Sequence, residues 1–496
     1  MPAPLGLAGA LDPQSLAWTG AVVDGEIQAP DGTWRLQGRP ALEWRPGAVE
    51  VRLASHCWER RQGQFCLTDP LTAGPGGAAV DAALEGFPLR DLRPWMPEGV
   101  DWDATLSAET AVRWQGAGLP EVTLSARSTP GRITAAPADA DESLTVEYQA
   151  LNLAAELDEA QATLSLGLKA EELGEVSASA RLDPSVADPP LDGEISVEGL
   201  RLGLIRPFLP QLRDLQGVVS VDGRLAGSLR APRFNGQVNL RQGLVALPDL
   251  PVPLEDIELT AEVAGASARI GGSFRSGEGV ARIGGSVSWE DTPTASVALQ
   301  GQDLEMAYPP LVRLRLSPAM TLSYDGEAVS VNGRLTVPWA RITVEELPAG
   351  ATTVSRDVVI VNEPAPEEGA GGEEGGLQLS TNVYLVLGDD VRFQGFGAQA
   401  GLTGRLQLRQ IGTDSAEAFG EVNLVDGSFR RFGQELTLRR GRFLFSGPLS
   451  EPRIHMEAIR KAEQVVAGLR VTGTPGHSRP ACSPNLPCPR RTHCRT

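Results

Sequence analysis

The stretch SLTVEYQALNLAAEL, residues 143–157, alternates apolar and polar side chains with a period of two. Leu144, Val146 and Tyr148 share one parity, and polar residues occupy the positions between them. Successive side chains of a β-strand point to opposite faces, so this pattern is typical of a strand with one buried face. The stretch therefore predicts a strand and not a helix.

The same alternation recurs along the chain, for example in RFNGQVNLRQG (233–243) and ASVALQGQDLEM (295–306). Turn signals such as VDG, YDG and PDG separate these stretches every ten to fifteen residues or so, which predicts roughly thirty to forty short strands. The best helix candidate lies near residues 205–215, where Pro207 and Pro210 keep it short.

Composition agrees with many short strands. The chain holds 56 glycines and 38 prolines, yet 41% of its residues are hydrophobic, which is too many for wholesale disorder. Runs of helix between strands are missing, which excludes a parallel βαβ architecture, and no closing boundary of a sandwich or barrel is visible. We predict an all-β fold, a long curled β-groove with a taco-like, solenoid-like sheet and a few short helices.

The apolar positions of such a sheet allow two interpretations. They either pack against each other as a core or line a groove for lipid tails, and periodicity alone leaves both open. The candidate lining positions are Val238, Leu240, Val422, Leu424, Phe443 and Phe445.

Charge excludes some partners. The net charge is −19, and nucleic acid requires a basic surface, so no nucleic-acid partner is expected. The N-terminus lacks the features of a signal peptide, and no stretch is long and apolar enough for a membrane-spanning helix. Taken alone, these features favour a soluble, cytoplasmic protein.

No catalytic constellation is apparent. GFGAQA (395–400) approaches a dinucleotide fingerprint, but a strand pattern follows it where a helix is required. Asp389 and Asp390 are interpreted as a turn, and neither His56 nor His455 has partners for nucleophilic catalysis. We predict no enzyme activity, no cofactor and no metal site.

Several stretches together resemble one family. They are TVPWARITVEELPAGATTVSRDVVIVNEPAPEEG (336–369), LQLSTNVYLVLGDDVRFQGFGAQAGLTGRLQL (377–408) and the run from AFGEVNLVDGSFRRFG to GLRVTGT (418–474). Their order resembles the C-terminal region of the TamB family, and the similarity extends over residues from about 20 to 474. The specific motifs lie in the C-terminal third.

The resemblance implies a taco-shaped β-groove with an apolar concave face. Families of this AsmA-like, bridge-type group are thought to carry phospholipids between the inner and outer membranes, so phospholipid acyl chains are the implied ligand. The alternative is a subunit of the translocation and assembly module, which acts in protein secretion and outer-membrane protein assembly with a BamA-type outer-membrane partner. A charge in mid-groove should block the first role, and disruption of the terminal edge strand, expected around 439–445, the second.

The resemblance also implies a location in the cell envelope, in the periplasm, with an anchor in the inner membrane. Such an anchor is missing here, and family members are far longer. We therefore expect a misplaced start, a truncated paralogue or a broken gene.

Motif residues of the family have structural interpretations. Five glycines match positions where turns or bulges need a missing Cβ, and a Ser-x-Asp pair matches a turn or cap. These residues are Gly420, Gly427, Gly433, Gly441, Gly447, Ser355 and Asp357.

Cys57 and Cys66 flank a hairpin-like turn and could face each other across two strands. The residues alone leave three alternatives for the two cysteines: a disulfide, a reduced buried pair or, with His56, part of a metal site. TamB-like sequences often carry a cysteine pair in such a hairpin, so the resemblance implies a disulfide. A disulfide fits an oxidising compartment and argues against the cytoplasm.

The chain ends in GTPGHSRPACSPNLPCPRRTHCRT (473–496), where Cys482, Cys488 and Cys494 are spaced too widely for a typical zinc site. Three cysteines also leave one unpaired. Codons compatible with this stretch can encode the family's continuation in a shifted frame. We expect an out-of-frame, disordered tail, the alternatives being a genuine disordered tail or a metal or disulfide site.

These observations predict four segments. They are an elongated β-groove (1–360), an acidic Gly-rich loop or linker (361–378), the C-terminal β-groove motifs (379–474) and the tail (475–496).

Overall fold

The computed structural model describes residues 5–344 and 378–482, with gaps at 31, 117, 136–142, 210, 249, 396, 413–414, 432–433, 463–464 and 475–478. Within these ranges most residues lie in strands β1 to β33, and the helices are two short 3-10 segments, η1 (Leu89–Trp95) and η2 (Leu202–Phe208). The predicted all-β fold class is confirmed. None of the helices in the described ranges is long and apolar enough to cross a membrane.

The helix expected near 205–215 is shorter than predicted and lies earlier. It ends at Phe208, and β18 begins at Asp214. A proline inside a helix removes a backbone donor, which explains why the segment stops after about two turns.

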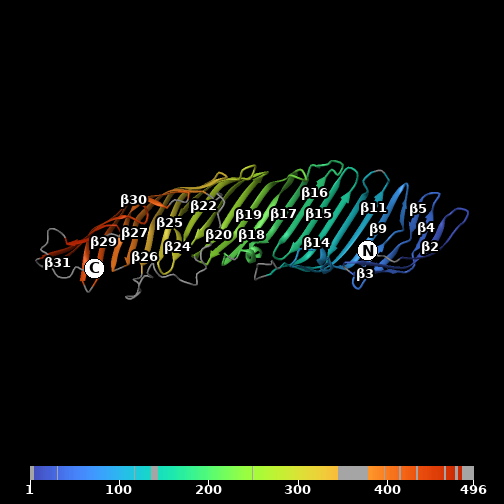
Figure 1. Ribbon diagram of the computed structural model, residues 1–496, viewed down its shortest axis with the longest axis horizontal. Coiled ribbons are helices and arrows are strands. Elements are labelled where there is room, and N and C mark those ends of the chain that lie inside the picture. The colour runs from blue at the N-terminus through green and yellow to red at the C-terminus, as the bar shows by residue number, and fades with distance from the viewer. Residues whose placement is uncertain are drawn as a thin grey trace, which may run out of the picture. The chain divides into compact units, whose positions relative to one another are not determined.

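The chain forms two compact units. Unit 1 comprises residues 1–243 and 260–266, and unit 2 comprises residues 244–259 and 267–496. Figure 1 shows the strands of each unit lying side by side, from blue to green in unit 1 and from yellow to red in unit 2. Residues 361–377 of the predicted loop lie outside the described residues. The loop and its boundaries therefore stay a prediction.

The strands of unit 1, of which β19 and β20 contain the boundary between units, are β1 (Leu5–Leu11), β2 (Trp18–Ala29), β3 (Gly32–Gln37), β4 (Ala41–Arg45), β5 (Glu50–Leu53), β6 (His56–Glu59), β7 (Gln64–Leu67), β8 (Leu71–Gly74), β9 (Gly77–Pro88), β10 (Val100–Asp103), β11 (Thr105–Trp114), β12 (Glu121–Ser128), β13 (Gly131–Ala135), β14 (Leu144–Leu157), β15 (Ala162–Ala170), β16 (Gly174–Leu182), β17 (Asp192–Arg201), β18 (Asp214–Gly227), β19 (Pro232–Leu247) and β20 (Leu250–Ala264).

Unit 1 is an antiparallel sheet. From β14 to β18 each strand pairs with the next strand in the chain. In its N-terminal half short hairpins intervene, so that β9 pairs with β7, β8 and β11, and β14 pairs with both β12 and β13. Consecutive antiparallel pairing preserves the side-chain alternation from strand to strand.

The buried core of unit 1 is small and lies where β13, β14 and β15 meet. Val146, Tyr148 and Ala170 are buried there, and a leucine of η2 packs against them. The indole Nε1 of Trp102 donates a hydrogen bond to the Tyr148 hydroxyl at 2.8 Å, and the Ser128 hydroxyl donates to the same oxygen at 2.9 Å. The buried phenol is thereby satisfied, as a buried polar group must be.

The remaining strands, all in unit 2, are β21 (Ser267–Ser276), β22 (Gly279–Ser288), β23 (Thr294–Gln302), β24 (Leu304–Tyr308), β25 (Val312–Tyr324), β26 (Ala328–Val344), β27 (Gln378–Gly395), β28 (Ala398–Ile411), β29 (Glu417–Arg431), β30 (Gln434–Pro448), β31 (Arg453–Ala462), β32 (Val465–Gly473) and β33 (Arg479–Cys482).

One pair of strands in unit 2 is parallel. Strand β26 runs alongside β27 in the same direction, from Ala328 opposite Gln378 to Val344 opposite Gly395. A cluster of buried residues, Val337, Ala340 and Val391, lies on these two strands. The sequence pattern did not predict this pairing, because alternation specifies faces and not strand direction.

The expected terminal edge strand is not at an edge. Residues 439–445 lie in β30, which pairs with β29 on one side and with β31 on the other. Beyond β31 come β32 and the short strand β33, whose backbone pairs Cys482 with Leu469. The prediction was wrong because the family motif does not reveal how many strands follow it. Strand β33 also shows that residues 479–482 of the expected disordered tail are paired in the structure.

Four of the five motif glycines are described, and they lie inside strands β29 and β30, not in turns. Gly420 has a φ of +132°, and a Cβ placed on it would overlap the carbonyl oxygen of Arg405 on β28. At Gly427 and Gly441 the missing Cβ leaves room for leucine side chains of a neighbouring strand, and Gly447 has a φ of +157°. The turn interpretation is therefore corrected, whereas the bulge alternative fits Gly427, which lies at a register shift between β28 and β29. At the described positions close approach or backbone conformation requires glycine.

We predict that Gly420→Val lowers the free energy of unfolding by about 3 kcal/mol, because a side chain there combines a left-handed φ with overlap against backbone. Urea unfolding measured by circular dichroism tests this. Gly167→Val is the matched control, since Gly167 also lies in a strand but has open space around its Cβ position. Equal losses of unfolding free energy in the two variants would contradict the conclusion that Gly420 is a position that requires glycine.

Candidate functional site

The sheet of unit 1 carries a continuous row of apolar side chains. Antiparallel register places one residue from each of seven strands, β9, β11, β12, β14, β15, β16 and β17, directly opposite the next. The row is Leu84, Ala108, Ala126, Leu153, Leu166, Ala178 and Ile195. Directly paired residues share a face, so the row lies on one side of the sheet, which we call the apolar face.

The neighbouring row, one residue along each strand, has the opposite character. From β11 to β17 it reads Glu109, Ser125, Ala154, Ser165, Ser179 and Glu194. These side chains point to the other side, the polar face. One sheet therefore separates a hydrocarbon-like surface from a hydrophilic one.

The apolar face is only half covered. In β12 and β16 every residue of this face is half-buried, Ser128 and Gly174 included, and every residue of the opposite face is exposed. Leu164 on β15 is 48% exposed. In a two-layered domain a second sheet or helix would bury such residues. Within the described ranges no second layer covers this row, so the face is open to a ligand.

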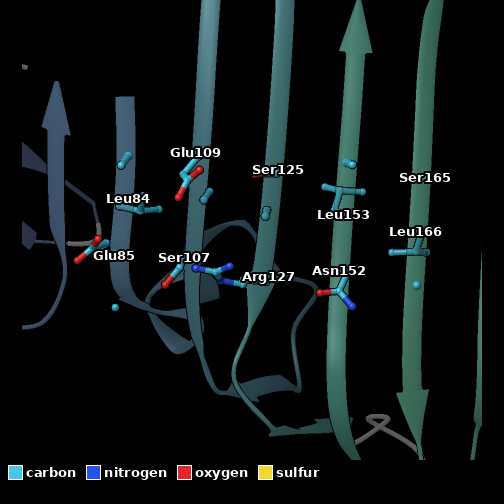
Figure 2. Close-up of a pocket in the computed structure, with 16 residues that line it drawn as sticks. Leu84, Glu85, Ser107, Glu109, Ser125, Arg127, Asn152, Leu153, Ser165 and Leu166 are labelled. Carbon is cyan, nitrogen blue, oxygen red and sulfur yellow. The ribbon is translucent and has the colours of Figure 1, made fainter. Parts of the chain in front are cut away.

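A hollow of about 670 Å³ lies at the level of this row, lined by β9, β11, β12, β14 and β15. Figure 2 shows its lining, in which Leu84, Leu153 and Leu166 come from β9, β14 and β15, while Glu109 and Arg127 come from the intervening strands β11 and β12. Its serines have no histidine or cysteine near them among the lining residues. The lining residues therefore provide no nucleophile with its base.

The groove-lining candidates in unit 2 share one face. Val422 lies directly opposite Phe443, while Phe445 and Leu424 lie opposite Gly420 and Gly441 respectively. Val422 is buried, and Leu424, Phe443 and Phe445 are half-buried. Their lining role stays a prediction.

The other two candidates lie on β19 in unit 1. Val238 and Leu240 are both half-buried and, being two residues apart, lie on the same face. The ring of Phe234 covers Gly223, which is opposite Ile195 of the apolar row. By the alternation of β19, Val238 and Leu240 continue the apolar face.

A buried arginine of unit 1 packs against two aromatic rings, and the sequence analysis did not anticipate it. The guanidinium of Arg60 lies 5.3 Å from the ring centre of Trp34 and 5.0 Å from that of Phe87, within the distance of a cation–π contact. It forms an ion pair with Asp91 of η1, and its side chain is 6% exposed. The buried charge of Arg60 is therefore balanced by a carboxylate.

Beside this arginine the structure joins Cys57 and Cys66 by a disulfide. The two residues lie directly opposite each other on β6 and β7, with Cα atoms 4.0 Å apart. The bond closes the hairpin whose turn carries Arg60.

We predict that reduction of this disulfide lowers the free energy of unfolding by about 2.5 kcal/mol, the chain-entropy value for a loop of this length. The loop spans a sequence separation of 9. Urea unfolding with and without dithiothreitol measures the difference. The variant Cys57→Ser with Cys66→Ser should be insensitive to reductant. An unchanged midpoint for the parent chain would count against a disulfide in solution.

Asp390 does not lie in a turn, as the sequence suggested, but within β27. Its carboxylate accepts a hydrogen bond of 3.0 Å from Arg341, and Arg392 lies 3.6 Å away. The hydrogen bond from Arg341, with the charges of both arginines, lowers the pKa of Asp390 below its usual value. A general acid needs a raised pKa, so this carboxylate suits a structural ion pair.

Metal-binding groups do not gather in the described residues, where no three His, Cys, Asp or Glu side chains are placed to hold an ion. Several predicted positions lie outside the described residues. They are Ser355, Asp357, Gly433, Cys488 and Cys494.

Comparison with known proteins gives matches along nearly the whole chain. The family described as TamB, N-terminal domain, matches residues 1–240, and the family described as TamB C-terminal domain matches residues 265–491. A relative, the translocation and assembly module subunit TamB of Haemophilus influenzae, is 24% identical over 471 residues. The match covers 92% of this chain and 36% of that relative, so the chain spans about a third of the relative's length.

Proposed function

The chain belongs to the TamB family, and from this premise we propose that its apolar face holds phospholipid acyl chains and conducts them between the inner and outer membranes. Headgroups would stay in water while the hydrocarbon lies on the sheet. The observation that carries the proposal is the uncovered apolar row from Leu84 to Ile195.

The energetics of this row suit conduction. Each CH₂ group removed from water contributes about 0.8 kcal/mol, so an acyl chain of some sixteen carbons is held by on the order of 10 kcal/mol. Adjacent strands are about 4.8 Å apart, and each presents leucine, alanine or isoleucine at the next step. A chain moving from strand to strand exchanges one contact for a similar one, so no single position traps it.

The same proposal extends to location and partners. A disulfide between Cys57 and Cys66 suits the oxidising periplasm. We infer that the protein works in the cell envelope, in association with the inner membrane and with a BamA-type outer-membrane partner. No catalytic residue is assigned.

A second candidate function rests on the relative from Haemophilus influenzae, which is named as a subunit of a translocation and assembly module. In that role a free sheet edge would pair with strands of client proteins. Strands β30, β31 and β32 are unsuited to this because both of their edges are paired, which leaves β33 as the candidate among the described strands at this end of unit 2.

Lipid co-purification tests the first function. The full chain, exported to the periplasm of a Gram-negative host and purified in mild detergent, should carry at least one phospholipid per chain by quantitative mass spectrometry. A folded chain without bound phospholipid would overturn the conduit and favour the assembly role.

A further inference from the structure

Near the end of unit 2 a second hollow, of about 830 Å³, lies against strands β29 to β32. Its chemistry differs from that of the apolar face. Polar side chains in the lining come from four adjacent strands and include Arg440, Arg442, Arg453 and His455. We call this hollow the arginine pocket.

The register between the strands explains why the polar side chains of the arginine pocket lie together. Asn423, Arg442, His455 and Thr472 lie directly opposite one another on β29, β30, β31 and β32. They therefore share one face of the sheet, which is opposite to the face of Val422 and Phe443. The row combines a guanidinium, an imidazole, an amide and a hydroxyl, each of which can donate a hydrogen bond.

The pocket is positive in an otherwise acidic chain. The protein has a net charge of −19, yet none of the residues that line this hollow is aspartate or glutamate. Such a concentration of arginine calls for a negatively charged partner, because like charges held together repel one another.

Nearby carboxylates balance the pocket only in part. Glu421 forms an ion pair with Arg442 at 3.6 Å. Glu457 lies opposite Arg440 in register, but its carboxylate is within 4.0 Å of Arg439 and Arg470. Among the described residues no ion pair joins Arg440 or Arg453 to an acidic side chain.

We infer that the arginine pocket binds a phosphate group, either a free phosphate or the phosphate of an anionic lipid headgroup. A guanidinium forms two parallel hydrogen bonds with phosphate oxygens, and the amide and hydroxyl can donate to others. The volume exceeds the needs of a bare phosphate and is within the range of small-molecule sites. This inference does not rest on the proposed acyl-chain conduit, which was argued from the apolar row of unit 1.

Titration of the full chain with inorganic phosphate, followed by calorimetry in a low-salt, phosphate-free buffer, tests the inference. Saturable binding is expected, weakened at least tenfold by Arg442→Gln with Arg453→Gln. The matched control is Arg132→Gln with Arg224→Gln, which removes the same charge from exposed ion pairs with Glu147 and Glu194 and should change nothing. Arg442→Lys with Arg453→Lys should retain part of the affinity, and thermal melting should verify that all variants fold.

Flotation with vesicles distinguishes the two sources of phosphate. Binding to vesicles of phosphatidylglycerol and phosphatidylcholine, lost in the glutamine variant and retained in the control, assigns the pocket to a lipid headgroup. Phosphate binding without such flotation assigns it to free phosphate. Absence of saturable binding in both assays, or equal losses in the glutamine variant and the control, overturns the inference.

Discussion

Leu153→Asp combined with Leu166→Asp is expected to remove at least nine-tenths of the phospholipid that co-purifies with the chain. The two leucines are directly opposite each other at the centre of the apolar row. An acyl chain lying across them would cover two carboxylates, and burial of an unpaired charge costs several kcal/mol or more. The measurement is the molar ratio of phospholipid to protein.

The alternation of the strands supplies a matched control. Ala154 and Ser165 lie one residue along the same two strands, are also directly opposite each other, and are exposed on the polar face. Ala154→Asp with Ser165→Asp therefore introduces the same pair of like charges at the same spacing and should leave lipid binding unchanged. Equal lipid content in the two variants, whether both high or both low, would contradict a role specific to the apolar face.

Arg60→Met is expected to lower the free energy of unfolding of unit 1 by about 3 kcal/mol. Removal of one partner from a buried ion pair costs roughly 3–5 kcal/mol, and the lower end applies because the Asp91 side chain is 27% exposed. The variant also loses the contacts with Trp34 and Phe87. Trp34 provides a fluorescence signal next to the site for urea or thermal unfolding.

Two further variants isolate the cause. Arg93 forms an ion pair with Asp101 in which both side chains are mostly exposed, so Arg93→Met should cost less than about 1 kcal/mol. Adding Asp91→Leu to Arg60→Met should restore much of the loss, because no unpaired carboxylate remains. If Arg60→Met were no more destabilising than Arg93→Met, the assignment of a buried ion pair between Arg60 and Asp91 would be wrong.

Much of the fold could be predicted from local pattern. In residues 143–157 the alternation predicts the strand, and on either side of a register shift between Tyr148 and Ala150 it also gives which side chains share a face, because side-chain direction alternates along a regular strand. The same rule predicts the all-β class. It also places Leu153 and Ala155 on one face and Asn152 and Ala154 on the other. The resemblance to the TamB family was also visible in the motifs.

The candidate sites depend more on the register between strands than on the local sequence pattern. Arg60 meets Phe87 and Asp91, which lie some thirty positions later in the chain, and no local pattern signals that contact. The parallel pairing of β26 with β27 and the close approach of Gly420 to Arg405 are likewise invisible to a period of two.

What the sequence by itself determined is the chemistry of each strand face, because alternation is a property of consecutive residues. Only the tertiary structure decided which strands are neighbours, and thus that Arg442, His455 and Thr472 line one pocket while Leu153 and Leu166 adjoin on an open face. The physical reason is that hydrogen bonds between strands join backbone groups common to all residues, so pairing partners follow from the packing of the whole sheet.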